Sequence, residues 1–144
     1  MPTEHFAYTN CMMISLAQLP ELPFTPKIGD LIYLSGDLAA GKTTLVQHFL
    51  ERFGISHAQV KSPTYTYYQH YTGSLGESIY HFDLYRITDY EIFINIGGQE
   101  ILENPQHLCF IEWPAILEDR FDRVRRININ KTTEQDTRDI TWDI

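Results

Sequence analysis

The chain has 144 residues, of which 43% are hydrophobic and 21% are charged, and its formal net charge is −8. This length and composition predict one globular domain over residues 1–144, large enough to bury a core without disulfides. The acidic charge disfavours a chain that grips nucleic acid by itself, because phosphate neutralisation supplies much of that affinity, and it favours a basic protein partner.

The first third of the chain predicts an irregular start, a strand and a helix. Residues 1–30 contain four prolines and are expected to be irregular, with a short helix within "MMISLAQL". "LIYLS" at 31–35 is an apolar run next to glycines, which predicts a buried strand. "KTTLVQHFLERFG" then places apolar residues at helical spacing, and Gly54 suits the C-terminal cap.

The rest of the chain adds strands on both sides of a helical stretch. "SPTYTYYQHY" and "SIYHFDLYR" flank a turn-rich segment and predict a hairpin. "TDYEIFINIG" predicts a helix with Thr88 or Asp89 as N-cap, and "GQEILEN" a second short one. "LCFIE", "RVRRININ" and "TRDITWDI" read as further strands. The pattern predicts an α/β fold with a mixed, partly antiparallel central sheet flanked by helices.

No apolar stretch approaches the roughly 18–20 residues of a membrane span, and the N-terminus lacks the pattern of a signal peptide. Cys11 and Cys109 lie far apart, in apolar surroundings. Neither has a second cysteine or a histidine at metal-ligand spacing, so the sequence disfavours zinc and predicts reduced core thiols. These features predict a cytoplasmic protein.

The segment "GDLAAGKT" from Gly36 to Thr43 fits the phosphate-binding pattern G-x-x-x-x-G-K-[ST]. It lies between a predicted strand and a predicted helix, as the motif requires, so backbone N–H groups and the helix N-terminus would face an anion. Lys42 can reach the β- and γ-phosphates, and the hydroxyl of Thr43 can bind Mg²⁺. The alternative is a glycine-containing turn with an exposed lysine. The candidate nucleotide-binding residues are Gly36, Asp37, Leu38, Ala39, Ala40, Gly41, Lys42, Thr43, Thr44 and Trp113.

Two acids follow predicted strands and could complete the site. Glu112 ends the apolar run "LCFIE", and ligands of α/β sheets lie at the carboxyl ends of strands, so it is the candidate metal-side carboxylate. Asp83 is either a water-orienting group or metal-shell acid, or a strand-edge acid paired with Arg86. His81 is expected to be a packed or hydrogen-bonded structural histidine rather than a base.

Three further residues have open alternatives. Thr64 in "SPT" could contact Mg²⁺ or the γ-phosphate, or could simply form a turn. Trp113 lies near the nucleotide or fills the core. Thr44 contacts the nucleotide or is an ordinary residue of the first helical turn. The guanine-reading motif N-K-x-D is missing, so a GTPase is disfavoured, whereas "RFDRVRR" leaves a small-molecule P-loop kinase open. A nucleotide-sensing interaction module whose hydrolysis is incidental is a third alternative.

In series, "SGDLAAGKTTLVQHFL", "SPTYTYY", "HFDLYR", "GGQEILEN" and "CFIEWPAILEDRF" resemble the bacterial tRNA threonylcarbamoyladenosine biosynthesis ATPase family TsaE, also called YjeE. The resemblance covers residues 31 to about 121. It implies a P-loop NTPase fold and a slow ATPase that uses ATP and Mg²⁺. Carried over by motif, Lys42 and Thr43 contact phosphate and Mg²⁺, Thr64 is the switch threonine, and Asp83 and Glu112 are the functional acids, with Trp113 beside the nucleotide.

The resemblance also implies partners. They are the threonylcarbamoyl-transferase subunit and its catalytically silent relative, with tRNA reached through the complex. The family's transferase makes the bond to tRNA, and the ATPase supports repeated turnover. One departure is Ala39, where the family usually has glycine. If that position requires positive φ, alanine costs roughly 1 kcal/mol.

Overall fold

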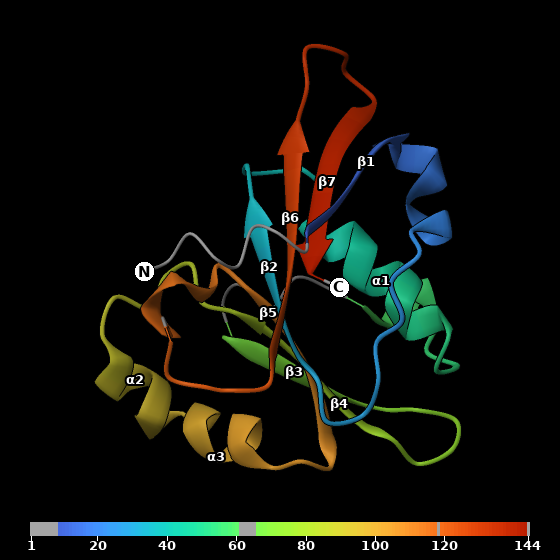
Figure 1. Cartoon of the computed structure of the whole chain (residues 1–144). Helices are drawn as coiled ribbons and strands as arrows, with labels where there is room; N and C mark the ends of the chain where they lie inside the picture. The colour runs from blue at the N-terminus through green and yellow to red at the C-terminus, as the bar shows by residue number, and fades with distance from the viewer. Residues whose placement is uncertain (1–8, 61–65, 118, 144) are drawn as a thin grey trace.

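A computed structural model describes residues 9–60, 66–117 and 119–143. Within these residues the chain forms a seven-stranded sheet in the order β1-β7-β6-β2-β5-β4-β3 (Figure 1). The elements are β1 (Thr9–Ser15), the 3₁₀ helix η2 (Leu16–Glu21), β2 (Leu31–Gly36), α1 (Lys42–Glu51), η3 (His57–Gln59), β3 (Tyr68–Thr72), β4 (Ser78–Asp83), α2 (Tyr90–Asn95), α3 (Gly98–Glu103), β5 (His107–Glu112), η4 (Pro114–Leu117), β6 (Val124–Lys131) and β7 (Thr137–Asp143).

The centre of the sheet is parallel and its two sides are antiparallel. β2 pairs in parallel with β6 and with β5, and β5 pairs in parallel with β4. β3 joins β4, and β7 joins both β6 and β1, as antiparallel neighbours. The carboxyl ends of β2, β4 and β5 therefore lie side by side at one edge, which is where α/β sheets bind ligands.

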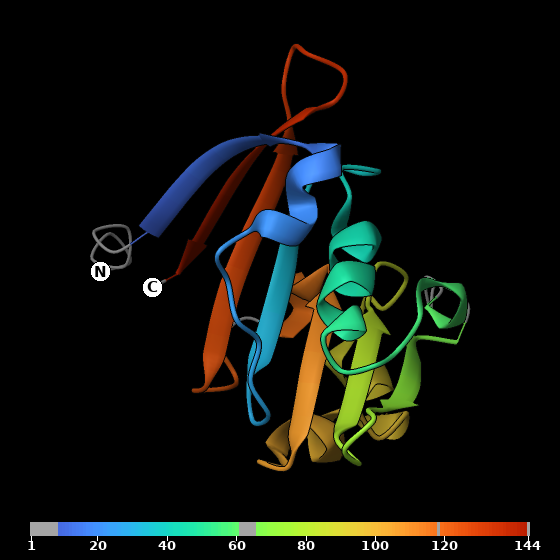
Figure 2. The same ribbon diagram turned by 90° about the vertical axis from the view of Figure 1, so that its right-hand side faces the viewer.

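The sheet buries both faces, and side chains alternate between them because successive residues of a strand point to opposite sides. In β2, Ile32 and Leu34 belong to one buried cluster, and Leu31 and Tyr33 belong to the other. The first cluster lies under α1 and η2, and the second lies under α2 and α3 on the opposite face (Figures 1 and 2). The predicted α/β class and mixed sheet flanked by helices are confirmed.

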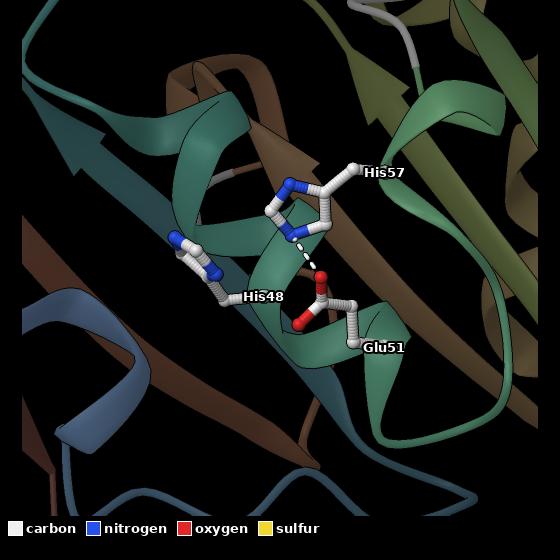
Figure 3. A group of neighbouring side chains, drawn as sticks. All are labelled: His48, Glu51 and His57. Carbon is white, nitrogen blue, oxygen red and sulfur yellow. Dashed lines mark ion pairs between the residues drawn. The ribbon is translucent and has the colours of Figure 1, made fainter. Parts of the chain in front are cut away.

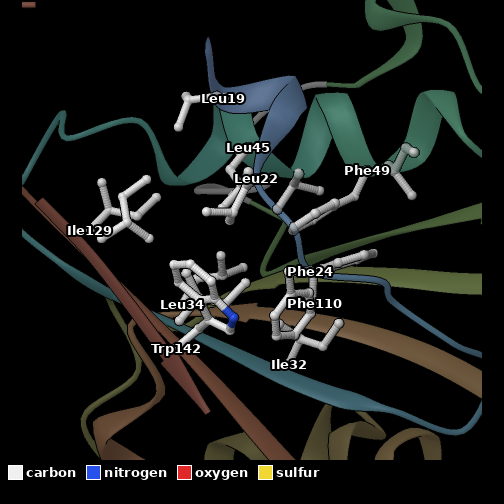
Figure 4. Close-up of a cluster of buried hydrophobic side chains, with 14 of the residues drawn as sticks. Leu19, Leu22, Phe24, Ile32, Leu34, Leu45, Phe49, Phe110, Ile129 and Trp142 are labelled. Atoms are coloured by element: carbon white, nitrogen blue, oxygen red, sulfur yellow. The ribbon is translucent and has the colours of Figure 1, made fainter. Parts of the chain in front are cut away.

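The α1 face carries the larger apolar cluster, drawn in Figure 4. α1 presents Leu45, Val46, Phe49 and Leu50 at helical spacing, all fully buried. The ring of Phe49 stacks on that of Phe110 from β5, with 5.7 Å between their centroids. This packing fixes the axis of α1, and with it the start of the helix, against the parallel strands.

Local signals place most of the predicted elements correctly. The predicted hairpin is the β3–β4 pair, but β3 begins only at Tyr68, and residues 62–65 of the predicted first strand lie outside the described residues. Asp89 caps α2 by accepting a hydrogen bond from the backbone N–H of Glu91. α1 ends at Glu51, before the predicted cap, and Gly54 follows in a left-handed conformation at φ 81°. The strands predicted at 31–35, 108–112, 123–130 and 137–144 are β2, β5, β6 and β7.

The prediction for the N-terminal region is wrong in part. Residues 9–15 are not irregular but form β1, and the expected helix in "MMISLAQL" is divided between this strand and η2. The reason is tertiary, because β1 takes its hydrogen bonds from β7 over the register Thr9↔Asp143 to Ser15↔Thr137. The residues of this segment alone do not indicate that it pairs with β7.

Only one of the two cysteines lies in the core. Cys109 is buried in β5, and burial raises the pKa of its thiol to about 12. Cys11 is exposed on β1, so the expectation of a core thiol is wrong for this residue. Among the described residues, every helix is too short or too polar to cross a membrane.

Three non-glycine residues in the described part of the chain have a left-handed backbone: Ala39 (φ 59°), Tyr67 (φ 67°) and Trp113 (φ 57°). Ala39 follows β2, and Trp113 directly follows β5. The carbonyl of Tyr67 accepts a hydrogen bond from the N–H of Asp83, the last residue of β4. All three strained positions therefore lie at the same edge of the sheet, and such strain clusters at functional sites.

Replacing Phe110 by alanine should lower the free energy of unfolding by roughly 3–5 kcal/mol, because it leaves a cavity under α1. Urea denaturation followed by circular dichroism measures this. The matched control is Leu75→Ala, since Leu75 is 88% exposed, and it should stay within about 0.5 kcal/mol of the parent. Equal losses in the two variants would contradict the assignment of Phe110 to the core.

Ala39→Gly should raise the free energy of unfolding by roughly 0.5–1 kcal/mol, because the relief of left-handed strain exceeds the added chain entropy. The neighbouring Ala40 is the control, since it is fully buried and lacks a positive φ. Ala40→Gly should lower stability by roughly 0.5–1 kcal/mol or more. Urea midpoints that move in the same direction for both variants would contradict the strained geometry.

Candidate functional site

The loop between β2 and α1 is shaped by two glycines. Gly36 has φ 131°, and a Cβ there would lie 1.7 Å from the carbonyl oxygen of Ile129 in β6. Only glycine therefore permits this close approach of the two strands. Gly41 precedes α1 with φ 119°, another conformation that favours glycine. The chain then enters α1 with its first N–H groups lacking partners within the helix.

Residues from the other end of the chain hold this loop from behind. A carboxylate oxygen of Asp37 accepts a hydrogen bond from the N–H of Lys131, at 2.9 Å. The buried guanidinium of Arg138 donates from Nε to the carbonyl of Ala40, at 2.8 Å. These contacts span more than ninety positions of sequence. Local sequence patterns do not predict these contacts, because Lys131 and Arg138 lie in β6 and β7, far along the chain from the loop.

Lys42 is folded onto the loop. Its ammonium donates to the carbonyls of Gly36 and Asp37, at 2.9 and 2.8 Å. It also lies 4.1 Å from the centre of the Trp113 ring, which is a cation–π distance. The side chain is 4% exposed, and this burial lowers the pKa of Lys42, although Glu112 and Asp37 oppose the shift. A lysine so desolvated gains from an anion placed against it.

Glu112 connects the loop to the sheet. Its Oε2 accepts a hydrogen bond from the hydroxyl of Thr43 at 2.8 Å, and it lies 2.5 Å from Nε2 of His81. All three belong to different elements: Thr43 to α1, His81 to β4 and Glu112 to β5. His81 is fully buried and hydrogen-bonded, as the sequence predicted. If Glu112 is ionised, it can only accept this hydrogen bond, so Nε2 of His81 must carry the proton.

Asp83 lies next to Glu112, because the two residues are paired in register on β4 and β5. It is 5% exposed, and its Oδ1 accepts a hydrogen bond from the N–H of Tyr85. Tyr85 lies beyond the end of β4 rather than on the strand, and its ring packs 5.0 Å from that of Trp113. Two nearly buried acids thus lie on adjacent strand ends.

These side chains surround one cavity of about 480 Å³. Its lining includes both acids and seven of the predicted nucleotide-binding residues: Leu38, Ala39, Gly41, Lys42, Thr43, Thr44 and Trp113. Tyr85 and Arg86 line it as well. Gly36, Asp37 and Ala40 do not line the cavity. These loop residues instead make the contacts with Lys42, Lys131 and Arg138 described above. Thr64, the predicted switch threonine, lies outside the described residues.

The donor set of the cavity fits a triphosphate with Mg²⁺. The hydroxyl of Thr43 and the carboxylates of Glu112 and Asp83 are hard oxygen donors, which Mg²⁺ prefers. Lys42 and the N-terminus of α1 are the complementary groups for phosphate. A cavity that pairs one buried cation with two buried acids therefore suits an anion carried together with a divalent metal.

Comparison with known proteins agrees over nearly the whole chain. The family model "Threonylcarbamoyl adenosine biosynthesis protein TsaE" matches residues 10–140. A tRNA threonylcarbamoyladenosine biosynthesis protein TsaE from Haemophilus influenzae is 48% identical over 84 residues, which are 58% of this chain and 51% of the relative. The Bacillus subtilis protein of the same name is 35% identical over 116 residues, covering 81% of this chain and 70% of its own length.

A solved structure shares the fold. The crystal structure of Bacillus subtilis YdiB superposes with a TM-score of 0.63 at 26% sequence identity, covering 93% of this chain and 84% of that one. The matched part of the chain spans about half the length of the Haemophilus influenzae relative. The order of motifs, the P-loop fold and the family model lead to the same conclusion: the chain belongs to the TsaE family of tRNA threonylcarbamoyladenosine biosynthesis proteins.

Proposed function

We propose that this chain binds ATP with Mg²⁺ in the cavity at the end of the sheet and hydrolyses it, as the ATPase subunit of the assembly that makes threonylcarbamoyladenosine in tRNA. The observation that carries the proposal is the hydrogen bond from Thr43 to Glu112 beside the buried ammonium of Lys42. In P-loop proteins the equivalent hydroxyl and carboxylate serve the metal, and the lysine serves the phosphates.

The chain would bind the triphosphate by exchanging contacts that it already makes. Lys42 would leave the carbonyls of Gly36 and Asp37 for phosphate oxygens, which keeps its charge satisfied. The first N–H groups of α1 and the positive end of its dipole add to the attraction. Trp113, which lies against Lys42, would form a wall of the site.

Thr43 and Glu112 would hold Mg²⁺, which supplies charge neutralisation on the phosphate oxygens when bound. His81 positions Glu112 from the buried side, so the carboxylate faces Thr43 in a fixed orientation. We assign Asp83 to the attacking water, because Glu112 is already committed to Thr43. The water oxygen forms a bond to the γ-phosphorus as the bond to the β-phosphate bridge breaks, giving ADP and phosphate.

The partners follow from the family rather than from the cavity. We propose that the chain has low intrinsic activity and works with the threonylcarbamoyl-transferase subunit and its catalytically silent relative. ATP hydrolysis would support repeated turnover of the transferase, and tRNA would be engaged through the complex. The net charge of −8 agrees with a chain that contacts protein partners rather than tRNA directly. Thr64 is proposed as the switch threonine on the basis of its motif alone.

Lys42→Ala should abolish measurable ATP binding or hydrolysis, because it removes the buried cation of the cavity. Asp83→Ala and Glu112→Gln should lower the hydrolysis rate by roughly 10²–10⁴-fold while losing less in nucleotide binding. Phosphate release in the presence of the partner proteins measures the rate. Asp122→Asn, an exposed acid outside the cavity, is the control and should keep the parent rate. Parent-level hydrolysis in both acid variants would overturn the assignment.

Reconstitution with the two partner proteins, ATP, the threonine-derived substrate and tRNA tests the wider role. We expect multiple turnovers of tRNA modification only with this chain and hydrolysable ATP. A nucleotide-sensing module would instead keep pathway function in Glu112→Gln. A small-molecule kinase would transfer phosphate to an added acceptor with no protein partner present. Either of those results would contradict the proposed role.

A further inference from the structure

A second group of potential ligands lies at the far end of α1. His48 and Glu51 are three residues apart and therefore share one face of the helix. His57 begins η3 and lies over the same face, with its ring toward Glu51 (Figure 3). One ligand atom from each of the three side chains lies within 4.8 Å of the other two. None of the three lines the cavity described above.

The two imidazoles have nitrogen atoms that no hydrogen bond in the described structure uses. Nδ1 of His48 and Nε2 of His57 are both shielded from solvent and lack hydrogen-bond partners among the described residues. Nε2 of His57 lies 2.6 Å from Oε1 of Glu51, yet without the geometry of a hydrogen bond. This contact is an ion pair, so the group without a partner is Nδ1 of His48, and a buried polar atom of that kind is costly unless something binds it.

Electrostatics favours a cation at this place. Arg52 does not neutralise Glu51, because its guanidinium donates to the carbonyls of Phe24 and Pro20. The ring centroids of His48 and His57 are 4.8 Å apart, and the ring planes meet at an angle of 63°. The two rings therefore do not stack face to face, and an ion can reach their nitrogen atoms.

The backbone holds the three residues in place without a metal. The turn after α1 closes with hydrogen bonds from the N–H groups of Gly54 and Ile55 to the carbonyls of Glu51 and Leu50. Ser56 caps η3, and Val60 just beyond it is buried and receives a hydrogen bond on its carbonyl from Gln47 of α1. The position of His57 is thus fixed between buried anchors on both sides.

We propose that His48, Glu51 and His57 form a binding site for a first-row transition-metal dication, with Zn²⁺ as the best match. Two imidazoles and one carboxylate are a preferred ligand set for zinc, with a water as the fourth ligand. Zinc–ligand bonds of about 2.0–2.2 Å place tetrahedral ligand atoms roughly 3.3–3.6 Å apart. The three ligand atoms lie within 4.8 Å of one another, so side-chain rotations that move each atom by about 1 Å bring them to these distances. The ion would join η3 to the end of α1.

This site is separate from the proposed nucleotide site. His48 is six residues after Lys42, which is roughly 9 Å along the helix axis. A zinc site here differs from the prediction made from the sequence. That prediction disfavoured zinc because only histidines near the two cysteines were considered as ligands. The signal in the sequence is H-x-x-E followed by a histidine six residues later, across a turn.

Titration of ZnCl₂ into metal-free protein, followed by calorimetry and by the thermal unfolding midpoint, tests the proposal. We expect one ion per chain and a higher unfolding temperature with zinc. His48→Ala, His57→Ala and Glu51→Gln should each weaken binding at least tenfold and remove the temperature shift. His70→Ala removes an exposed histidine outside the group and should change neither quantity.

Competing zinc sites give distinct results. The exposed thiol of Cys11 and the buried pair of His81 and Glu112 are the alternatives in the described structure. Cys11→Ser and His81→Ala should therefore keep the stoichiometric binding. Absence of stoichiometric binding would overturn the proposal, and so would binding that persists in both His48→Ala and His57→Ala. Because His57 is 39% exposed, its variant should fold even if loss of His48 disturbs α1.

Discussion

The hydrogen bond between Thr43 and Glu112 is the contact on which the arrangement of the site depends. It joins the first turn of α1 to the end of β5, two segments 69 positions apart in sequence. The close approach of Gly36 to β6 sets the start of the loop, and the stacking of Phe49 on Phe110 sets the helix axis. With both ends fixed, the loop has little freedom, and the hydroxyl and the carboxylate meet inside the cavity.

Buried charge in the site is balanced rather than isolated. Lys42, Asp83 and Glu112 are each no more than 5% exposed, and an unpaired buried charge is costly. Lys42 meets this cost with two carbonyls and an aromatic ring, and Glu112 meets it with Thr43 and His81. The two carbonyl contacts of Lys42 and the contact of Thr43 with Glu112 are ones that a phosphate or a metal could replace. The polar groups of the site are therefore already arranged for a ligand. Ala39 and Trp113, which have a strained left-handed backbone, lie at the same edge of the sheet.

Sequence patterns predicted the features that are local and missed those that depend on distant pairing. The strand β2, the glycine-containing loop after it, α1 and the acid at the end of β5 could be predicted, because residue spacing and glycine placement determine them. β1 was missed because its strand conformation depends on β7. The contacts of Lys131 with Asp37 and of Arg138 with Ala40 were also invisible, since each links positions more than ninety residues apart. The group at His48 was missed because a turn separates its third member.

The most direct test of the central claim is a crystal structure of the chain grown with Mn²⁺ and a non-hydrolysable ATP analogue, using the anomalous signal of manganese as a stand-in for Mg²⁺. The account predicts the triphosphate against Lys42 and the loop before α1. It also predicts the metal at the hydroxyl of Thr43, with Glu112 in its coordination sphere or joined to it by one water. A triphosphate bound elsewhere, or a metal remote from both Thr43 and Glu112, would contradict it.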